Sequence, residues 1–230
     1  MGNQNIVIGI EGTVGAGKTS ICRQLLGKIE NSILLHGGNI YRAIAYGIAN
    51  SHLNKQEMKK IDAFEIMKQL EIEIKLENRE TVVYSKGKQI EEKDLQSDKI
   101  SMLVSQVSNV AKNEKLYQLG KDLIDKFRKD YHVILSSRDI VKMYPAFTYH
   151  FFIDASIEER VNRKYRQYNK EIEKEKIREM IEERDRLQEK SGYYKIYPKT
   201  QVIDVTNCKT PEESAEKVFQ KIEKFREENR

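Results

Sequence analysis

A glycine-rich stretch near the amino terminus has the residue types and spacing of a phosphate-binding loop. Gly9–Ser20 has the sequence GIEGTVGAGKTS, which fits the pattern G-x-x-x-x-G-K-[ST] from Gly12 to Thr19. In such a loop the backbone N–H groups hold phosphate oxygens, the lysine reaches the β- and γ-phosphates, and the hydroxyl ligates Mg²⁺. We therefore predict an ATP site with Mg²⁺ on Thr19. Its predicted residues are Gly12, Thr13, Val14, Gly15, Ala16, Gly17, Lys18, Thr19 and Ser20.

Short apolar runs supply the strands that this loop needs. A first run leads directly into the loop, and helical spacing of apolar residues follows Lys18. Helical patterns also fill the gaps between the later runs, an alternation typical of a parallel sheet with helices on both faces. We predict an α/β, P-loop NTPase-type, three-layer sandwich with a five-stranded parallel sheet. The predicted strands are Asn5–Ile10, Ser32–Leu35, His132–Leu135, Thr148–Ile153 and Gln201–Val205.

Two stretches fall outside this sandwich. Leu70–Ile90 alternates apolar and polar residues around turns at Asn78–Arg79 and Lys86–Gly87, which predicts a small inserted antiparallel ribbon. Residues 156–190 are densely charged and predict two helices that meet near residues 167–169. This helical stretch lies between the fourth and fifth strands, where ligands bind in such folds.

Composition excludes several classes of protein. The chain has 230 residues, 33% of them charged, and a formal net charge of +5. That charge favours anionic ligands, or is simply that of a lysine-rich surface. Cys22 and Cys208 are far apart in sequence and indicate reduced thiols in a cytoplasm. The apolar run Ile6–Ile10 is too short for a signal peptide or membrane span. Glutamates between the basic residues of 160–190 argue against nucleic-acid binding, and no protein partner is evident.

Five further motifs stand in a fixed order along the chain. They are HGGNIYR at 36–42, SNVA at 108–111, SRDI at 137–140, DASIEERVNRK at 154–164 and EERDR at 182–186. Together with the loop and the ribbon, they resemble the bacterial-type cytidylate kinases, which are P-loop nucleoside monophosphate kinases. The resemblance implies a single kinase domain. Its parts would be a core of 1–69, 113–155 and 191–230, an acceptor-binding insert of 70–112 and a lid of 156–190.

The resemblance also implies roles for residues that would bind the acceptor. Arg42 would clamp the acceptor phosphate, Arg138 would lie by the phosphates, and Asp139 would lie near the acceptor sugar hydroxyls. Ser108 and Arg184 would help to hold the base. Arginine suits such work because its planar fork grips phosphate in two places.

The lid would add cations over the transferring group. By the resemblance these are Arg160, Arg163 and Lys164, so that the expected catalytic residues are Lys18, Arg138, Asp139, Arg160 and Arg163. A purely structural alternative stays open, because residues three and four apart also occur on the solvated face of an ordinary charged helix.

The chain departs from the family pattern around the acceptor. His36 and Gly37 replace an aspartate and a serine, while Tyr117 and Ser191 replace arginines. Gln188 replaces an aspartate one helical turn after Arg184. A carboxylate only accepts hydrogen bonds, whereas a carboxamide also donates and can tolerate a keto edge. We therefore expect altered or loosened choice of acceptor.

The expected activity is ATP-dependent transfer to a nucleoside monophosphate, either CMP or dCMP or a related pyrimidine nucleotide. Two alternatives remain open. One is a kinase of deoxynucleosides or another small molecule, although the region after the second strand lacks the acid that deoxynucleoside kinases need there. The other is an ATP-binding sensor whose catalysis has decayed at Tyr117 and Ser191. The residue pattern leaves the base, the sugar and the oligomeric state open.

Overall fold

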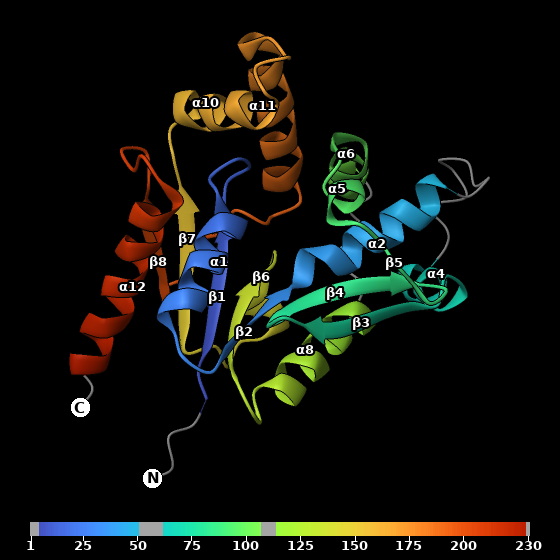
Figure 1. Ribbon diagram of the computed structural model, residues 1–230, viewed down its shortest axis with the longest axis horizontal. Coiled ribbons are helices and arrows are strands. Elements are labelled where there is room, and N and C mark those ends of the chain that lie inside the picture. The colour runs from blue at the N-terminus through green and yellow to red at the C-terminus, as the bar shows by residue number, and fades with distance from the viewer. Residues whose placement is uncertain (1–4, 51–61, 107–113, 229–230) are drawn as a thin grey trace.

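A computed structural model describes residues 5–50, 62–106 and 114–228. The described chain folds around one mostly parallel sheet with the strand order β3-β4-β2-β6-β1-β7-β8 (Figure 1). All five predicted parallel strands are present, each with ends within two residues of the prediction. They are β1 (Val7–Gly12), β2 (Ser32–His36), β6 (His132–Ser136), β7 (Tyr149–Asp154) and β8 (Thr200–Asp204).

The prediction of a five-stranded sheet is wrong, because the ribbon joins the sheet and brings it to eight strands. The ribbon consists of β3 (Ile72–Glu77), β4 (Glu80–Ser85) and β5 (Lys88–Gln89). Leu34 of β2 donates its N–H to Arg79 O at 2.8 Å, and Arg79 Nε donates to Ser32 O at 2.8 Å. The turn before β4 therefore pairs with the edge of β2, which would otherwise expose unpaired backbone groups.

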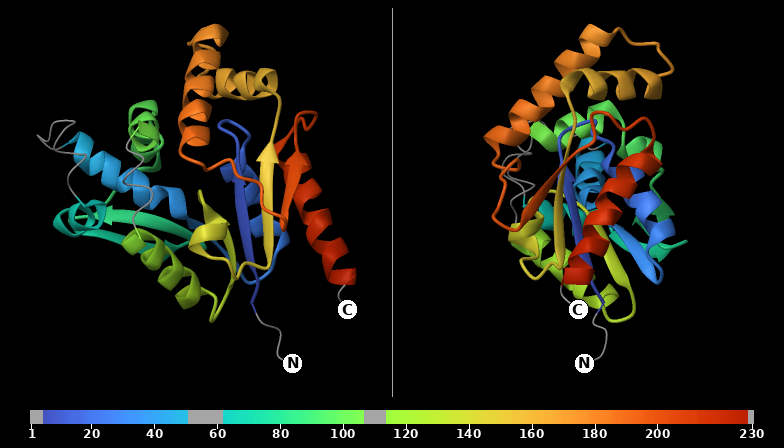
Figure 2. Two further views of the ribbon diagram at one scale, coloured as in Figure 1. Left: turned by 180° about the vertical axis from the view of Figure 1, so that it is seen from behind. Right: turned by 90° about the vertical axis from the view of Figure 1, so that its left-hand side faces the viewer.

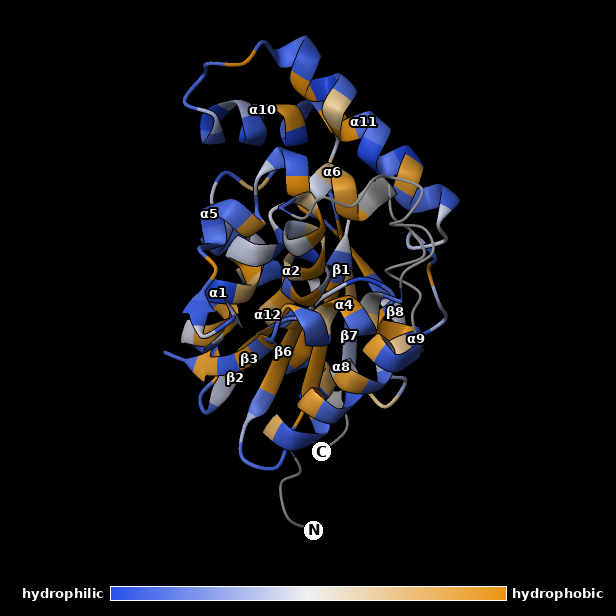
Figure 3. Ribbon diagram, turned by 90° about the vertical axis from the view of Figure 1, so that its right-hand side faces the viewer, coloured by the Kyte–Doolittle hydropathy of each residue, from blue (hydrophilic) through white to orange (hydrophobic). Residues whose placement is uncertain are grey.

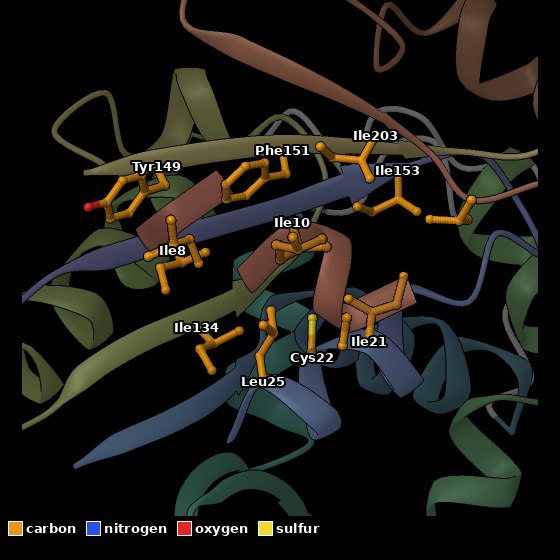
Figure 4. Close-up of a cluster of buried hydrophobic side chains, with 14 of the residues drawn as sticks. Ile8, Ile10, Ile21, Cys22, Leu25, Ile134, Tyr149, Phe151, Ile153 and Ile203 are labelled. Atoms are coloured by element: carbon orange, nitrogen blue, oxygen red, sulfur yellow. The ribbon is translucent and has the colours of Figure 1, made fainter. Parts of the chain in front are cut away.

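The sheet forms the middle of three layers. Successive strand residues point to opposite faces. Ile8 and Ile10 face one hydrophobic cluster, which includes residues of α1 (Lys18–Lys28) and α12 (Pro211–Glu228), as Figure 4 shows in part. Val7 faces the other cluster, which includes residues of α8 (Glu114–Phe127) and α9 (Ile140–Met143). The predicted three-layer sandwich is confirmed.

Two groups of helices stand at the carboxyl ends of the strands. The helices α10 (Ile157–Gln167) and α11 (Lys174–Lys190) form an arm over the ends of β1 and β7 (Figures 1 and 2). Much of this arm is hydrophilic (Figure 3). To one side of it lie α2 (Gly37–Ala49), α4 (Ala63–Gln69), α5 (Glu92–Leu95) and α6 (Asp98–Gln106).

The two groups of helices touch each other over the sheet. Tyr168 follows α10 and donates its hydroxyl to Asp98 Oδ1 of α6 at 2.6 Å. The arm also packs on the loop after β1, because the side chain of Val14 belongs to the same buried cluster as Val161, Ile177 and Ile181. The space enclosed between these helices and the strand ends is the candidate site.

Candidate active site

The loop between β1 and α1 has the backbone shape that binding of phosphate requires. Gly12 has φ +147°, and a Cβ on it would lie 2.0 Å from Ile153 O. Gly17 has φ +92° and is the N-cap of α1. Residues without a side chain are therefore needed where the loop leaves β1 and where it enters α1. The loop ends at a helix N-terminus, whose N–H groups and partial positive charge favour an anion.

This loop lines a cavity of about 930 Å³. All the predicted ATP-binding residues lie on its wall except Thr13, whose hydroxyl donates to Asp154 Oδ1 at 3.0 Å. One end of the cavity, which we call the donor end, also includes residues 208–211 and Ser214. The opposite end, which we call the acceptor end, is lined by Tyr41, Arg42, Ser101, Val104, Arg138, Arg184, Gln188 and Tyr193.

Lys18 lies on the cavity wall close to several other cations. Its Nζ donates to Gly12 O at 2.8 Å and to Thr13 O at 2.7 Å. Burial, followed by the charges of Arg138 and Arg184, lowers the pKa of Lys18 to about 7. Burial and the neighbouring arginines outweigh the attraction of Asp185, so the charged ammonium is disfavoured, which is the condition that a bound polyphosphate would relieve.

The three arginines predicted to bind the acceptor meet at the acceptor end. Arg42 Nη1 donates to Leu95 O and to Ser101 Oγ, both at 3.0 Å. Within the described ranges, the buried Arg138 Nη1 and Arg184 Nε have no hydrogen-bond partner. Burial lowers the pKa of all three arginines, to about 9 for Arg42, and their mutual repulsion contributes for Arg42 and Arg138. Their guanidinium groups nevertheless stay charged at neutral pH. Such a concentration of positive charge is suited to an anion.

The cations of the arm occupy three different environments. Arg160 does not line the cavity, and its side chain donates to Ala155 O, to Val14 O at 3.1 Å and to Asp185. Arg163 lines the donor end and donates to Ala16 O at 2.9 Å. Lys164 also lines the cavity, and burial lowers its pKa.

Asp139 stands behind the wall of the cavity. It is 7% exposed, does not line the cavity, and accepts a hydrogen bond from the Tyr117 hydroxyl at 2.7 Å. Its φ of 55° is a left-handed conformation that non-glycine residues rarely adopt. The expected contact of Asp139 with an acceptor sugar stays a prediction, as do the catalytic roles of Arg160 and Arg163. Ser108 lies outside the described residues.

Two residues that the sequence did not single out hold the loop in place. Asp185 Oδ1 accepts the N–H of Val14 at 3.1 Å and also the hydroxyl of Tyr194. The Tyr194 oxygen lies 3.2 Å from the same N–H of Val14. Asp185 lies within the EERDR motif, so its role could have been predicted from that motif. No pattern in the sequence around Tyr194 indicates its contact with the loop.

Thr19 is the residue that could hold a metal. It lines the cavity at the start of α1, and the described residues contain no cluster of three or more metal-ligating side chains. In a phosphate-binding loop one such hydroxyl joins phosphate oxygens and water around Mg²⁺.

Known proteins resemble this chain over nearly its full length. The sequence model of the family described as cytidylate kinase matches residues 8–224. The cytidylate kinase of Clostridioides difficile (strain 630) is 30% identical over 225 residues, which cover 95% of this chain and 98% of that protein. The cytidylate kinase of Caldicellulosiruptor saccharolyticus is 30% identical over 224 residues, which cover 94% of this chain and 95% of that protein. A solved shikimate kinase from Acinetobacter baumannii has a TM-score of 0.40 and 15% identity, covering 95% of this chain and 93% of its own.

Proposed function

The chain belongs to the cytidylate kinase family, and we propose that it transfers the γ-phosphoryl group of ATP to the phosphate of CMP or dCMP. One observation supports this proposal above the others. The cavity has a phosphate-binding loop on one side and, on the other, guanidinium nitrogens of Arg138 and Arg184 that have no partner among the described residues. A site that brings two phosphorylated molecules together needs cations on both sides of the transferring group.

In the proposed reaction an oxygen of the acceptor phosphate attacks the γ-phosphorus. The bond from that phosphorus to the β–γ bridging oxygen breaks, and ADP leaves with the electron pair. Negative charge spreads over the transferring group, so positioned cations do more than an acid or a base. Lys18 and the loop N–H groups would hold the β- and γ-phosphates. Arg42, Arg138 and Arg184 would orient the acceptor.

The arm of α10 and α11 would complete the donor side. Arg163 contacts the loop carbonyl of Ala16 and would add positive charge beside the phosphates, while Lys164 lies close enough to Arg184 and Arg42 to be repelled by them. Mg²⁺ on Thr19 would neutralise part of the phosphate charge when bound. The closed arrangement of the arm and α6 would exclude water, which limits hydrolysis of ATP.

The division into core, acceptor-binding insert and lid is part of the same proposal, with the bounds predicted from the sequence. We also propose that the protein works in the cytoplasm on small nucleotides. In the described ranges, no helix has the length and apolar character required to cross a membrane.

A panel of nucleoside monophosphates with MgATP tests the proposal through release of ADP. We expect acceptor-dependent ADP with CMP or dCMP, and its loss in Lys18→Ala, because that change removes charge at the phosphates without touching the core. Lys129→Ala is the matched control, since Lys129 is an exposed lysine in the turn before β6. ATP binding without any acceptor-dependent ADP would contradict the proposal, and so would unchanged turnover in Lys18→Ala.

A further inference from the structure

Among the described residues, the acceptor end of the cavity offers hydrogen-bond donors but no free carboxylate. The acids that line the described cavity are Glu11 and Glu92. Glu11 accepts the N–H of Ile140 and lies 3.4 Å from His150 Nε2, so it is engaged behind the loop. Glu92 pairs with Arg23 at 2.7 Å. A base that presents an amino group therefore finds no described carboxylate free to receive it.

Gln188 takes the position from which α11 can read an acceptor base. It is 4% exposed, lines the cavity, and lies one helical turn beyond Arg184 on α11. Its side-chain amide makes no hydrogen bond to any residue within the described ranges, although its backbone carbonyl accepts the N–H of Tyr193. The buried hydroxyl of Tyr193 lacks a partner among the same residues. Buried polar groups normally have partners, so the Tyr193 hydroxyl is suited to bind a ligand, and the Gln188 amide lies on the cavity wall where it can do the same.

The remaining wall of this end suits a flat ring. Tyr41, Val104 and Tyr193 are each less than 9% exposed and present apolar surface to the cavity beside Gln188. Aromatic and aliphatic faces of this kind bury a base, while a few polar groups select its edge.

A carboxamide matches two pyrimidine edges, whereas a carboxylate matches one. With its oxygen toward the exocyclic amine, the amide of Gln188 accepts from cytosine N4 and donates to N3. Turned by 180°, it accepts from uracil N3–H and donates to O4. A carboxylate in its place could accept from cytosine N4 but would place an anion against uracil O4. The chain thus has the group that serves both bases where its family pattern has the group that serves one.

We propose that the acceptor pocket takes uridine monophosphates as well as cytidine monophosphates, and that Gln188 is the residue that admits both. This inference rests on the proposed function, because it assigns the acceptors of the same site. It predicts that kcat/KM for UMP lies within about tenfold of the value for CMP, because the amide makes two hydrogen bonds to either base and the difference between them is worth less than one full hydrogen bond.

The decisive variant is Gln188→Glu, which replaces only the amide NH₂ by an oxygen. We expect the ratio of kcat/KM for CMP to that for UMP to rise by about tenfold or more, because the NH₂ donor to O4 becomes an acceptor. Glu189→Gln is the matched control, being the reverse exchange at an exposed neighbour on the same helix, and should leave the ratio unchanged. A strict preference for CMP in the unaltered protein would overturn the inference, as would an unchanged ratio in Gln188→Glu.

Binding separates this inference from the proposed reaction. Calorimetric titration of CMP and UMP into the protein, saturated with a non-hydrolysable ATP analogue and Mg²⁺, measures base recognition without transfer. Dissociation constants within about tenfold of each other support the inference even if no ADP is released, in which case the proposed function alone fails. Binding of CMP with no detectable binding of UMP overturns the inference even if transfer to CMP is normal.

Discussion

Replacing Arg160 by methionine tests whether this residue stabilises the loop or acts on the reacting phosphates. The side chain of Arg160 is 11% exposed and that of Asp185 is 19% exposed. Arg160→Met keeps the aliphatic length but removes the donors to Ala155 O and Val14 O, and it leaves the Asp185 carboxylate without its cation. The change therefore removes one of the two hydrogen bonds that join the arm to the backbone of Val14 in the phosphate-binding loop, and it leaves the other, from Val14 N–H to Asp185.

The expected cost follows from what Asp185 retains. Breaking a buried ion pair by removing one partner costs about 3–5 kcal/mol. Asp185 keeps two donors, Val14 N–H and the Tyr194 hydroxyl, and is partly exposed. We therefore expect a loss of about 2–3 kcal/mol in the free energy of unfolding, or roughly 4–12 °C in Tm for a chain of this length.

A double-mutant cycle isolates the pair. Asp185→Asn alone should also destabilise, and the double variant Arg160→Met/Asp185→Asn should lose less than the sum of the two single changes, because the second change removes the stranded charge. Thermal unfolding gives the four stabilities, and acceptor-dependent ADP release gives the four rates. Additive losses would refute the coupling. An unchanged Tm with turnover reduced by about a hundredfold or more would instead favour the catalytic role expected for Arg160 from the sequence.

Two further predictions concern the loop itself. Because the pKa of Lys18 is lowered to about 7, its side chain is largely uncharged at pH 8 and takes up roughly one proton when phosphates bind. Affinity for MgATP should thus fall as the pH rises above 7. The heat of MgATP binding, measured in buffers of different ionisation enthalpy, should reveal the proton uptake, and Lys18→Met should abolish that uptake. Equal binding heats of the unaltered protein in all buffers would contradict this prediction. Gly12→Ala should abolish MgATP binding, because its Cβ would lie 2.0 Å from Ile153 O, whereas Gly27→Ala on the exposed face of α1 meets nothing within 4 Å and should bind normally. Retained binding in Gly12→Ala would show that the loop can relax.

The sequence predicted the framework well because the framework depends on local patterns. Apolar runs located the parallel strands, and the turn at Asn78–Arg79 was located by its residue types before the structure showed positive φ at both positions. The number of strands was wrong for a reason that no local pattern contains. The ribbon pairs with β2 through Arg79, whose guanidinium caps carbonyls of α1 and β2. Such a contact depends on where two distant segments meet.

The site was predicted in part for the same reason. The loop pattern fixes its own backbone, so all but one of the residues predicted to bind ATP line the cavity, and so do Arg184 and Gln188, which were predicted to hold the acceptor. Helical spacing placed Arg160 and Arg163 near one another but could not show that Arg160 is buried against Val14 O while Arg163 faces the cavity. Burial of a charged side chain is decided by the segment that packs on it, and periodicity describes only the helix that carries it.

A single helix thus contributes to both halves of the proposed reaction. Asp185 of α11 holds the N–H of Val14 in the phosphate-binding loop, and Gln188, less than one turn further along, faces the acceptor end. The side chain of Val14 is in turn buried among apolar residues of the arm, so the loop and α11 are joined by packing as well as by hydrogen bonds. Because helices are stiff over so short a span, α11 itself would set the distance between the proposed donor phosphates and the edge of the proposed acceptor base. Under this proposal, the choice of side chain at position 188 would change which base is bound without changing where its phosphate lies.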